Sequence, residues 1–395
     1  MKIRALPISA SLLIAGAACA PGAMAHDIDN SARSAPQIAP ATPDQPAATP
    51  PRPARAEFAQ FTPTNDPIRH RIDYAIWDYA LKNIVISMGP SNRRTAGSLP
   101  PAYGTRIRQG HNSRYRLEGS LVSFLWLDDE VISSLTEYRR DLESVPDTLD
   151  LAMIPRNEQL AFWINLHNVA LLEQLALHWP VRQPRSLEID GVLLDDAKVI
   201  TVQGVSMSLK ELRENIVYAN WRDPKVIYGF WRGEIGSPAL QRDAYTGANV
   251  SSLLDLAADD YVNSLRGTQK SGSRLDVSTL YEETRAFYFP DFEQDVRTHL
   301  SDYARSDVTE ILGETETMRA SIREFDIADL SGGKRLASYL FVDGESPRAP
   351  QGLIELLRQR ETKLDNMRRR DEMTGQVIFS NIDLPGDPPN KNAVQ

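Results

Sequence analysis

Residues 155–180 constrain the fold more than any other part of this sequence. The segment reads PRNEQLAFWINLHNVALLEQLALHWP and is bounded by Pro155 and Pro180. Proline is tolerated in the first turn of a helix but interrupts a helix interior. The stretch between the two prolines therefore predicts one long helix.

Two asparagines on this predicted helix, Asn165 and Asn168, are the first candidate site residues. They are three positions apart, so they lie on one helix face, amid Phe162, Trp163 and Leu166. Asparagine is a mediocre residue for a helix interior, because its amide competes for backbone hydrogen bonds. Buried amides need partners, so we expect the pair to hold the backbone of a neighbouring loop. A pair of amides facing a ligand is the alternative.

Patterns elsewhere predict short strands and further helices. The expected elements are a strand beginning near Ser120, a helix beginning near Asp128, a hairpin over 198–207 with Gly204 in its turn, a helix that Ser208 caps, a buried strand over 225–231 and an amphipathic helix over 250–265. Helices outnumber strands. The expected fold class is therefore α+β, a mainly helical single domain with a small β-sheet.

The N-terminus has the three parts of a secretory signal peptide. Lys2 and Arg4 precede an apolar run over residues 8–18, and Ala-Met-Ala at 23–25 precedes His26. The apolar run is too short to span a membrane. We therefore expect cleavage near Ala25, and a periplasmic or secreted protein without a later transmembrane segment.

Cys19, the one cysteine of the chain, lies inside this expected signal peptide. Cleavage would leave a mature chain without disulfides, thiolate metal sites or a cysteine nucleophile. Gly16-Ala17-Ala18-Cys19 also resembles a lipoprotein box, but Gly16 stands where such boxes usually carry leucine. Lipid anchoring at Cys19 is the less favoured alternative.

Charge and histidine spacing exclude two further classes of partner. Removing the two basic residues of the signal peptide from the net charge of −9 leaves −11, which disfavours binding to nucleic acid. His167 and His178 are eleven residues apart on the long helix, hence about 16 Å apart along its axis and too far to share an ion. The other histidines are scattered, so no metal site and no cofactor is expected.

The chain divides by composition. The expected parts are a signal peptide over 1–25, a disordered Pro/Ala-rich linker over 26–62, a folded domain over 63–335, an extension over 336–380 and a disordered tail over 381–395. The extension contains a predicted amphipathic helix over 350–372 with a leucine stripe. We expect this helix to dock on its own domain, with docking on a partner as the alternative.

The stretch YGFWRGEIGSPALQRDAYTG, residues 228–247, is expected to carry the site. It reads as a strand that delivers a polar loop to the start of a helix. Ser237 followed by Pro238 is typical of a helix N-cap, with a serine nucleophile as the alternative. Arg232 and Glu234 are expected to form a salt bridge that closes the loop, with an anion-binding cleft at Arg232 as the alternative.

Several motifs together resemble the family called domain of unknown function 547. They are EQLAFWINLHNVALL, DPKVIYGFW, GSPAL, YTGANVSSLLDLAADDYV and the pair FYFPDFEQDV and IREFDIADL. The resemblance covers roughly residues 70–330, and its most specific part is FWINLHN, where the family usually has FWINLYN.

Departures from the family pattern bear on function. Typical members have histidine at the position of Ile227, a cysteine near Arg232 and a second cysteine at the position of Ser237. Those residues imply a thiol-dependent hydrolase of the papain or transglutaminase type, and none of them is present here. The framework residues are retained: Trp163, Asn165, Asn168, Asp223, Pro224 and Gly247.

Three functions follow from this comparison. The first is an exported binding or scaffold protein on a domain without thiol chemistry, acting on an unknown small molecule or envelope protein. The second is a hydrolase or transferase that uses Ser237, His167, Glu234 and Arg232. The third is a cell-envelope interaction module that works through the linker and the helix over 350–372. The sequence leaves open whether the protein is an enzyme.

The signal peptide gives a testable prediction. The mature protein is expected to begin at His26 and to react with no thiol reagent after denaturation, because Cys19 leaves with the signal. Mass spectrometry of the protein isolated from its producing cells measures both properties. A mature chain that retains Cys19 with attached lipid would contradict the soluble assignment.

Overall fold

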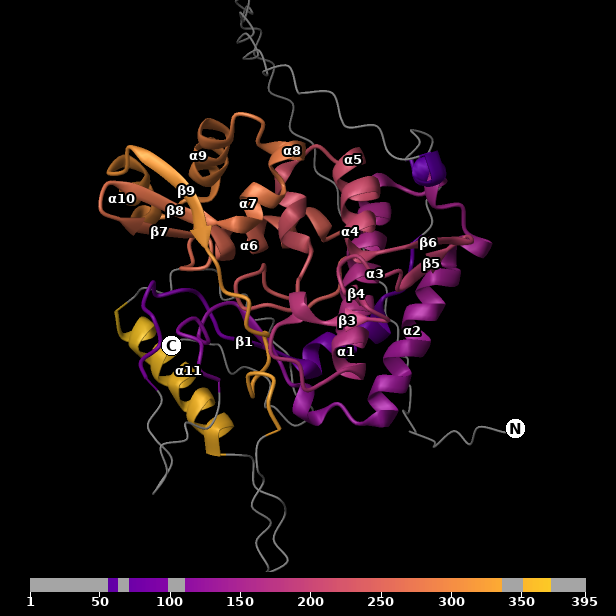
Figure 1. Cartoon of the computed structure of the whole chain (residues 1–395), viewed down its shortest axis with the longest axis horizontal. Coiled ribbons are helices and arrows are strands. Elements are labelled where there is room, and N and C mark those ends of the chain that lie inside the picture. Colours follow the sequence, from indigo (N-terminus) through magenta and orange to yellow (C-terminus); the bar gives the residue numbers. More distant parts are fainter. Residues whose placement is uncertain (1–55, 63–70, 99–110, 336–350, 371–395) are drawn as a thin grey trace, which may run out of the picture. The chain divides into compact units, whose positions relative to one another are not determined.

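Helix α3 (Arg156–Leu177) is the central element of the fold (Figure 1). It begins directly after Pro155, as the sequence predicts, and almost every side chain from Glu158 to Ala176 is buried. By length and composition alone α3 could cross a membrane. Its burial inside the fold identifies it as a core helix.

The computed structural model describes residues 56–62, 71–98, 111–335 and 351–370. All of them belong to one compact unit within residues 50–395. The expected signal peptide, most of the expected linker and the expected C-terminal tail lie outside the described residues.

Ten further α-helices lie in the described residues. They are α1 (Ala75–Ile84), α2 (Asp129–Thr148), α4 (Leu209–Glu211), α5 (Tyr218–Asn220), α6 (Val250–Val262), α7 (Thr279–Glu283), α8 (Arg285–Tyr288), α9 (Phe292–Tyr303), α10 (Ser306–Gly313) and α11 (Gln351–Arg369). A π-helical turn, Leu212–Val217, joins α4 to α5, so residues 209–220 form one continuous helical segment.

Strands of the described residues form four small sheets. The antiparallel pairs are β1 (Val85–Ser87) with β2 (Ser120–Val122), β3 (Glu188–Ile189) with β4 (Val192–Leu193), and β5 (Ile200–Val202) with β6 (Val205–Met207). The fourth sheet joins β7 (Thr268–Ser271) antiparallel to β8 (Arg274–Ser278), and β8 parallel to β9 (Thr317–Ile322). The predicted α+β class is confirmed, although several small sheets replace the single one expected.

Local signals located several elements correctly. The Asp128 carboxylate accepts the Val131 amide proton at the start of α2. Gly204, with φ of 77°, occupies the β5–β6 turn, as predicted. Ser208 caps the next helix in a reciprocal capping box with Glu211.

The predicted strand over 225–231 is wrong. Residues Pro224–Gly229 form a 3-10 helix instead. Asp223 accepts the Lys225 amide proton, and Pro224 supplies a backbone angle suited to a first helical turn. The apolar run that follows is buried on every side, and such a run does not distinguish a strand from a buried helical turn.

The packed part of the chain begins before the boundary expected at residue 62. Residues Ala56–Phe61 form a 3-10 helix that buries Phe58 and Phe61. Phe61 meets Trp163 of α3 edge to face, with 5.1 Å between the ring centroids. The end of the expected linker is thus part of the core.

Helix α11 docks on its own chain, as the sequence favours. Leu353, Leu356 and Met367 of its apolar stripe are buried. The buried ammonium of Lys363 donates to the carbonyl oxygens of Met88, at 3.2 Å, and Leu117, at 2.6 Å. The alternative, a leucine stripe open to a partner, is not what the structure shows.

The contact between Phe61 and Trp163 gives a prediction about stability. Phe61→Ala is expected to lower the free energy of unfolding by about 3–5 kcal/mol, because it empties a buried aromatic site. Gln60→Ala, an exposed neighbour, serves as the control and should change it little. Urea unfolding of both variants measures the difference. Equal stability of the two would show that the segment does not contribute to the core.

Candidate functional site

Asn165 and Asn168 hold two loops against α3. Asn165 donates to the Tyr245 carbonyl at 2.7 Å and accepts from the Tyr245 amide at 3.1 Å. Asn168 donates to the Gly229 carbonyl at 2.9 Å and accepts from the Trp231 amide at 3.2 Å. The amides therefore hold neighbouring backbone, as expected, and are not free for a ligand.

Gly247, another framework residue, is held by the same helix. Its amide donates to Glu158 Oε2 at 2.9 Å, and a Cβ at Gly247 would overlap that carboxylate. The other oxygen of Glu158 accepts from the Ile72 amide at 3.0 Å. Glycine is needed here because the loop passes directly over the carboxylate.

His167 is fixed in one tautomer by its two neighbours. Arg213 donates to Nε2 at 2.8 Å, and because a guanidinium only donates, Nε2 must be the acceptor. Nδ1 therefore carries the proton and donates to Asn168 Oδ1 at 3.0 Å. Every polar atom of the imidazole is thus engaged.

His167 is consequently unsuited to the base role that the enzyme hypothesis gives it. Its side chain is fully buried, and burial, together with the charges of Arg213 and Arg232, holds its pKa well below the ordinary value. A base must reach the proton that it removes. Neither nitrogen contacts Ser237.

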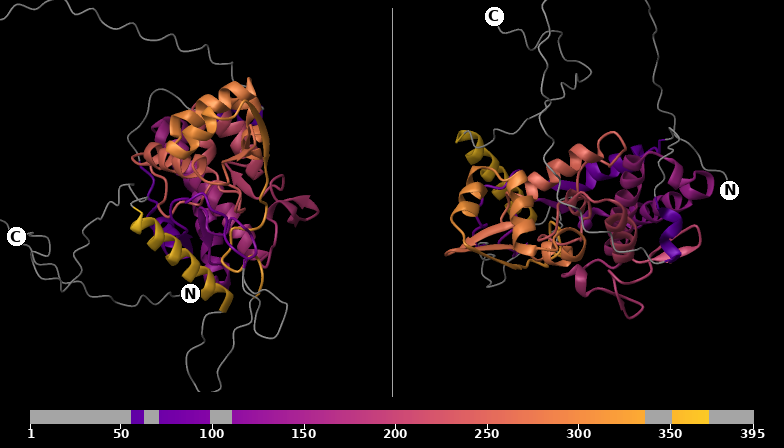
Figure 2. Two further views of the ribbon diagram at one scale, coloured as in Figure 1. Left: turned by 90° about the vertical axis from the view of Figure 1, so that its left-hand side faces the viewer. Right: turned by 90° about the horizontal axis from the view of Figure 1, so that it is seen from above.

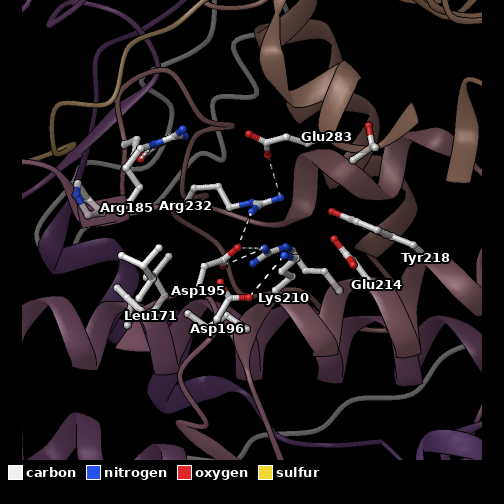
Figure 3. Close-up of a pocket in the computed structure, with 16 residues that line it drawn as sticks. Leu171, Arg185, Asp195, Asp196, Lys210, Glu214, Tyr218, Arg232 and Glu283 are labelled. Atoms are coloured by element: carbon white, nitrogen blue, oxygen red, sulfur yellow. Dashed lines mark hydrogen bonds and ion pairs between the residues drawn. The ribbon is translucent and has the colours of Figure 1, made fainter. Parts of the chain in front are cut away.

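A pocket of about 500 Å³ opens beside this network (Figure 3). Its walls come from α3, residues 184–185, the β3–β4 hairpin and the segment after it, the α4–α5 segment, the loop that contains Arg232 and the end of α7. Arg213 lies at its inner side and pairs with Asp195 through both carboxylate oxygens, at 2.8 and 2.6 Å. Arg213 and Arg232 keep the pKa of Asp195 low, against the opposing effect of burial.

Arg232 points into this pocket between Asp195 and Glu283 (Figure 3). Its guanidinium nitrogens lie 3.5 Å from Asp195 and 3.7 Å from Glu283, beyond the length of a strong charge-assisted hydrogen bond. The side chain is 17% exposed, and its buried Nε has no hydrogen-bond partner in the described residues. The carboxylates raise the pKa of Arg232 against burial, so it stays charged.

The expected salt bridge between Arg232 and Glu234 is wrong. Glu234 instead receives two hydrogen bonds from Arg185, at 2.6 and 2.7 Å. The backbone of Glu234 forms an isolated antiparallel β-bridge with Ile327, and its side chain lines the same pocket as Asp195. Arg185 in turn stacks over the ring of Phe325.

Ser237 does not cap a helix. The segment after it is irregular, and the next helix, α6, begins at Val250. Backbone contacts tie the loop to a neighbouring segment instead: the Ile235 amide donates to the Asp326 carbonyl at 2.9 Å, and the Gly236 amide to the Glu324 carbonyl at 3.0 Å. These long-range bonds explain why the Ser-Pro signal failed.

The Ser237 hydroxyl has a structural role within its own loop. It donates to the Glu234 carbonyl at 2.7 Å and accepts from the Arg232 amide at 3.3 Å. No base contacts it within the part of the chain that the structure describes. The hydroxyl is therefore not set up as a nucleophile.

Sequence reasoning missed most of the pocket. Arg213, Glu214 and Tyr218 reach it from the π-helical turn and its end, a feature found often at functional sites. Asp195 and Glu283 come from separate segments with no local motif. No local pattern in residues 193–214 indicates that their charged side chains converge on Arg232.

Metal binding has no support in the described residues, because no three histidine, aspartate or glutamate side chains are grouped there as an ion would require. The pocket carboxylates are instead distributed among the arginines.

Buried histidines give a pH prediction. Burial lowers the pKa of His111 and His299 to about 4, and that of His167 well below its ordinary value. The unfolded chain therefore binds more protons than the folded one below about pH 6.5. Stability should fall as the pH drops from 7 to 5, by up to about 1.4 kcal/mol per pH unit for each histidine. Urea unfolding at several pH values in this range measures how the free energy of unfolding changes with pH. That change per pH unit should be smaller for His299→Gln than for the unmodified protein, and an equal change would contradict this account.

Comparison with known proteins gives one match. Residues 151–262 match the model of the family described as protein of unknown function, DUF547. No curated protein and no solved structure matches the chain. The matched region contains α3, the β3–β4 hairpin, the π-helical turn and Arg232, hence all of the pocket lining except Glu283 and Thr284. The resemblance seen in the sequence motifs is thereby confirmed over residues 151–262, whereas the motifs at 287–296 and 322–330 lie outside the matched span.

Proposed function

We propose that this domain binds a small organic anion at Arg232 and forms no covalent bond with it. One observation carries the proposal: a largely buried guanidinium faces a pocket of about 500 Å³, and its ion pairs with the protein are long. Arginine in such a position is suited to a planar anion that it can meet with two parallel hydrogen bonds.

Energetics favour an occupied site. A buried donor without a partner costs about 1–3 kcal/mol, and the Nε of Arg232 is such a donor. Tyr218 adds a second unpartnered polar group, its hydroxyl, at the same pocket. A carboxylate or phosphate group in the pocket would pair with the charged guanidinium of Arg232. The volume lies within the range of small-molecule sites, about 300–1,000 Å³.

A hydrolase or transferase is supported less well. His167 has both nitrogens engaged, and the Ser237 proton is directed to a backbone carbonyl. Glu234 is held by Arg185. Of the four residues that the enzyme hypothesis combines, only Arg232 has unused hydrogen-bonding capacity.

We also propose that the protein acts outside the cytoplasm, in the periplasm or as a secreted protein. The composition of residues 1–25 supports this location. Interaction with an envelope partner through the leucine stripe of α11 has no support, because that stripe is packed on the chain itself.

Arg232→Ala tests the binding proposal. Isothermal titration calorimetry with acetate, succinate and inorganic phosphate is expected to show binding of at least one probe by the unmodified protein and none by the variant. Stability should fall by only about 1 kcal/mol, since the lost ion pairs are long. Arg358→Ala, an arginine exposed on α11, is the matched control and should bind normally.

Two outcomes would contradict this function. One is unchanged binding in Arg232→Ala, or binding of no probe by the unmodified protein. The other is hydrolysis of an ester or peptide that disappears in a correctly folded Ser237→Ala variant, which would establish the enzyme instead.

A further inference from the structure

The charges that line the pocket limit what kind of anion fits. Four basic residues, Arg185, Lys210, Arg213 and Arg232, face five acidic ones, Asp195, Asp196, Glu214, Glu234 and Glu283. A ligand with only negative charge would increase the excess of acid in a partly enclosed site, where like charges repel strongly. A ligand that also carries a positive charge leaves the balance unchanged.

Glu214 is placed to meet such a positive charge. It lines the pocket from the π-helical turn, and it makes no ion pair within the described residues. Its neighbour Lys210 is paired with Asp196, at 3.5 Å. Figure 3 shows the polar ends of Glu214 and Tyr218 directed toward the side on which Arg232 lies. The pocket thus offers a ligand one basic side chain with only long ion pairs, Arg232, and one acidic side chain without an ion pair in the described residues, Glu214.

The remaining wall of the pocket is aliphatic. It consists of Leu171, Pro184, Leu193, Leu194 and Leu209. Leu193 belongs to the β3–β4 hairpin, which turns through Asp190 and Gly191 at positive φ and projects from the rest of the described chain in both views of Figure 2. Val192 and Leu193 are about half exposed there, at 45% and 46%. An aliphatic group of a ligand would cover this surface.

We infer that the ligand is an aliphatic zwitterion, either a free amino acid or a short peptide with a free amino group and a free carboxylate. Its carboxylate meets Arg232, its ammonium group meets Glu214, and its side chain lies on the leucine wall. This inference rests on the proposed function, because it assigns the anion at Arg232 to a carboxylate.

Ligands that differ by one group test the inference by calorimetry on the mature protein. L-leucine is compared with 4-methylpentanoate, which lacks the amino group, with L-leucinamide, which lacks the carboxylate, and with L-asparagine, a polar analogue of similar shape. Loss of the amino group should weaken binding about fivefold. Loss of the carboxylate should weaken binding about thirtyfold or more. Replacement of the leucine side chain by the polar side chain of asparagine should weaken binding about tenfold.

A peptide pair distinguishes the two sources of the same chemistry. Alanyl-leucine is compared with N-propionyl-leucine, which is the same molecule without its amino group. Tighter binding of alanyl-leucine than of leucine identifies a short peptide as the ligand, and the reverse order identifies a free amino acid. Either supports the inference when removal of the amino group weakens binding.

Glu214→Gln should abolish the preference for the amino group, so that leucine and 4-methylpentanoate bind equally. Glu282→Gln, an acid exposed beside the pocket on α7, is the control and should keep the preference. Equal binding of leucine and 4-methylpentanoate by the unmodified protein would overturn the inference and leave the proposed function intact. Equal binding of leucine and leucinamide would overturn both.

Discussion

The structure depends on hydrogen-bond and ion-pair partners for the polar side chains of one buried helix. Helix α3 is buried around its whole circumference, yet it carries Glu158, Asn165, His167, Asn168 and Glu173. Each would cost free energy without a partner. Four of them find that partner in a loop, an amide or an arginine brought from a distant part of the chain, and Glu173 pairs with Arg139. The loops around α3 are therefore positioned by the polar groups of the core as much as by apolar packing.

The same hydrogen bonds fix the positions of side chains in the pocket. Hydrogen bonds lead from the Gly229 carbonyl through Asn168, His167 and Arg213 to Asp195 at the pocket surface. The chain of contacts does not conduct protons, because a guanidinium keeps its protons throughout the accessible pH range. It instead fixes the direction in which Arg213 and Asp195 point. A site built this way is suited to holding a charged ligand in one orientation.

Elements set by neighbouring residues could be predicted from the sequence, and elements set by distant ones could not. The prolines around α3, the Asp128 cap and the Ser208 capping box act within one helical turn, and all were placed correctly. Ser237 carries an equally good local signal, but bonds to residues 324–326 override it. Arg232 was selected for its fixed charge, whereas its partners Asp195 and Glu283 are too distant in sequence for any periodicity to indicate them.

Helix α11 has a consequence for how the region can be expressed. Lys363 is bound by carbonyls of residues 88, 89 and 117, and a side chain at Gly89 would collide with Leu364. Both partners in this contact lie outside the span of family similarity, residues 151–262. A recombinant fragment trimmed to that span would lack Phe61 beside Trp163 and Glu283 beside Arg232. The residues that pack together thus extend beyond the span of family similarity. The ends of a fragment that folds have to be chosen from these packing contacts and not from the family match.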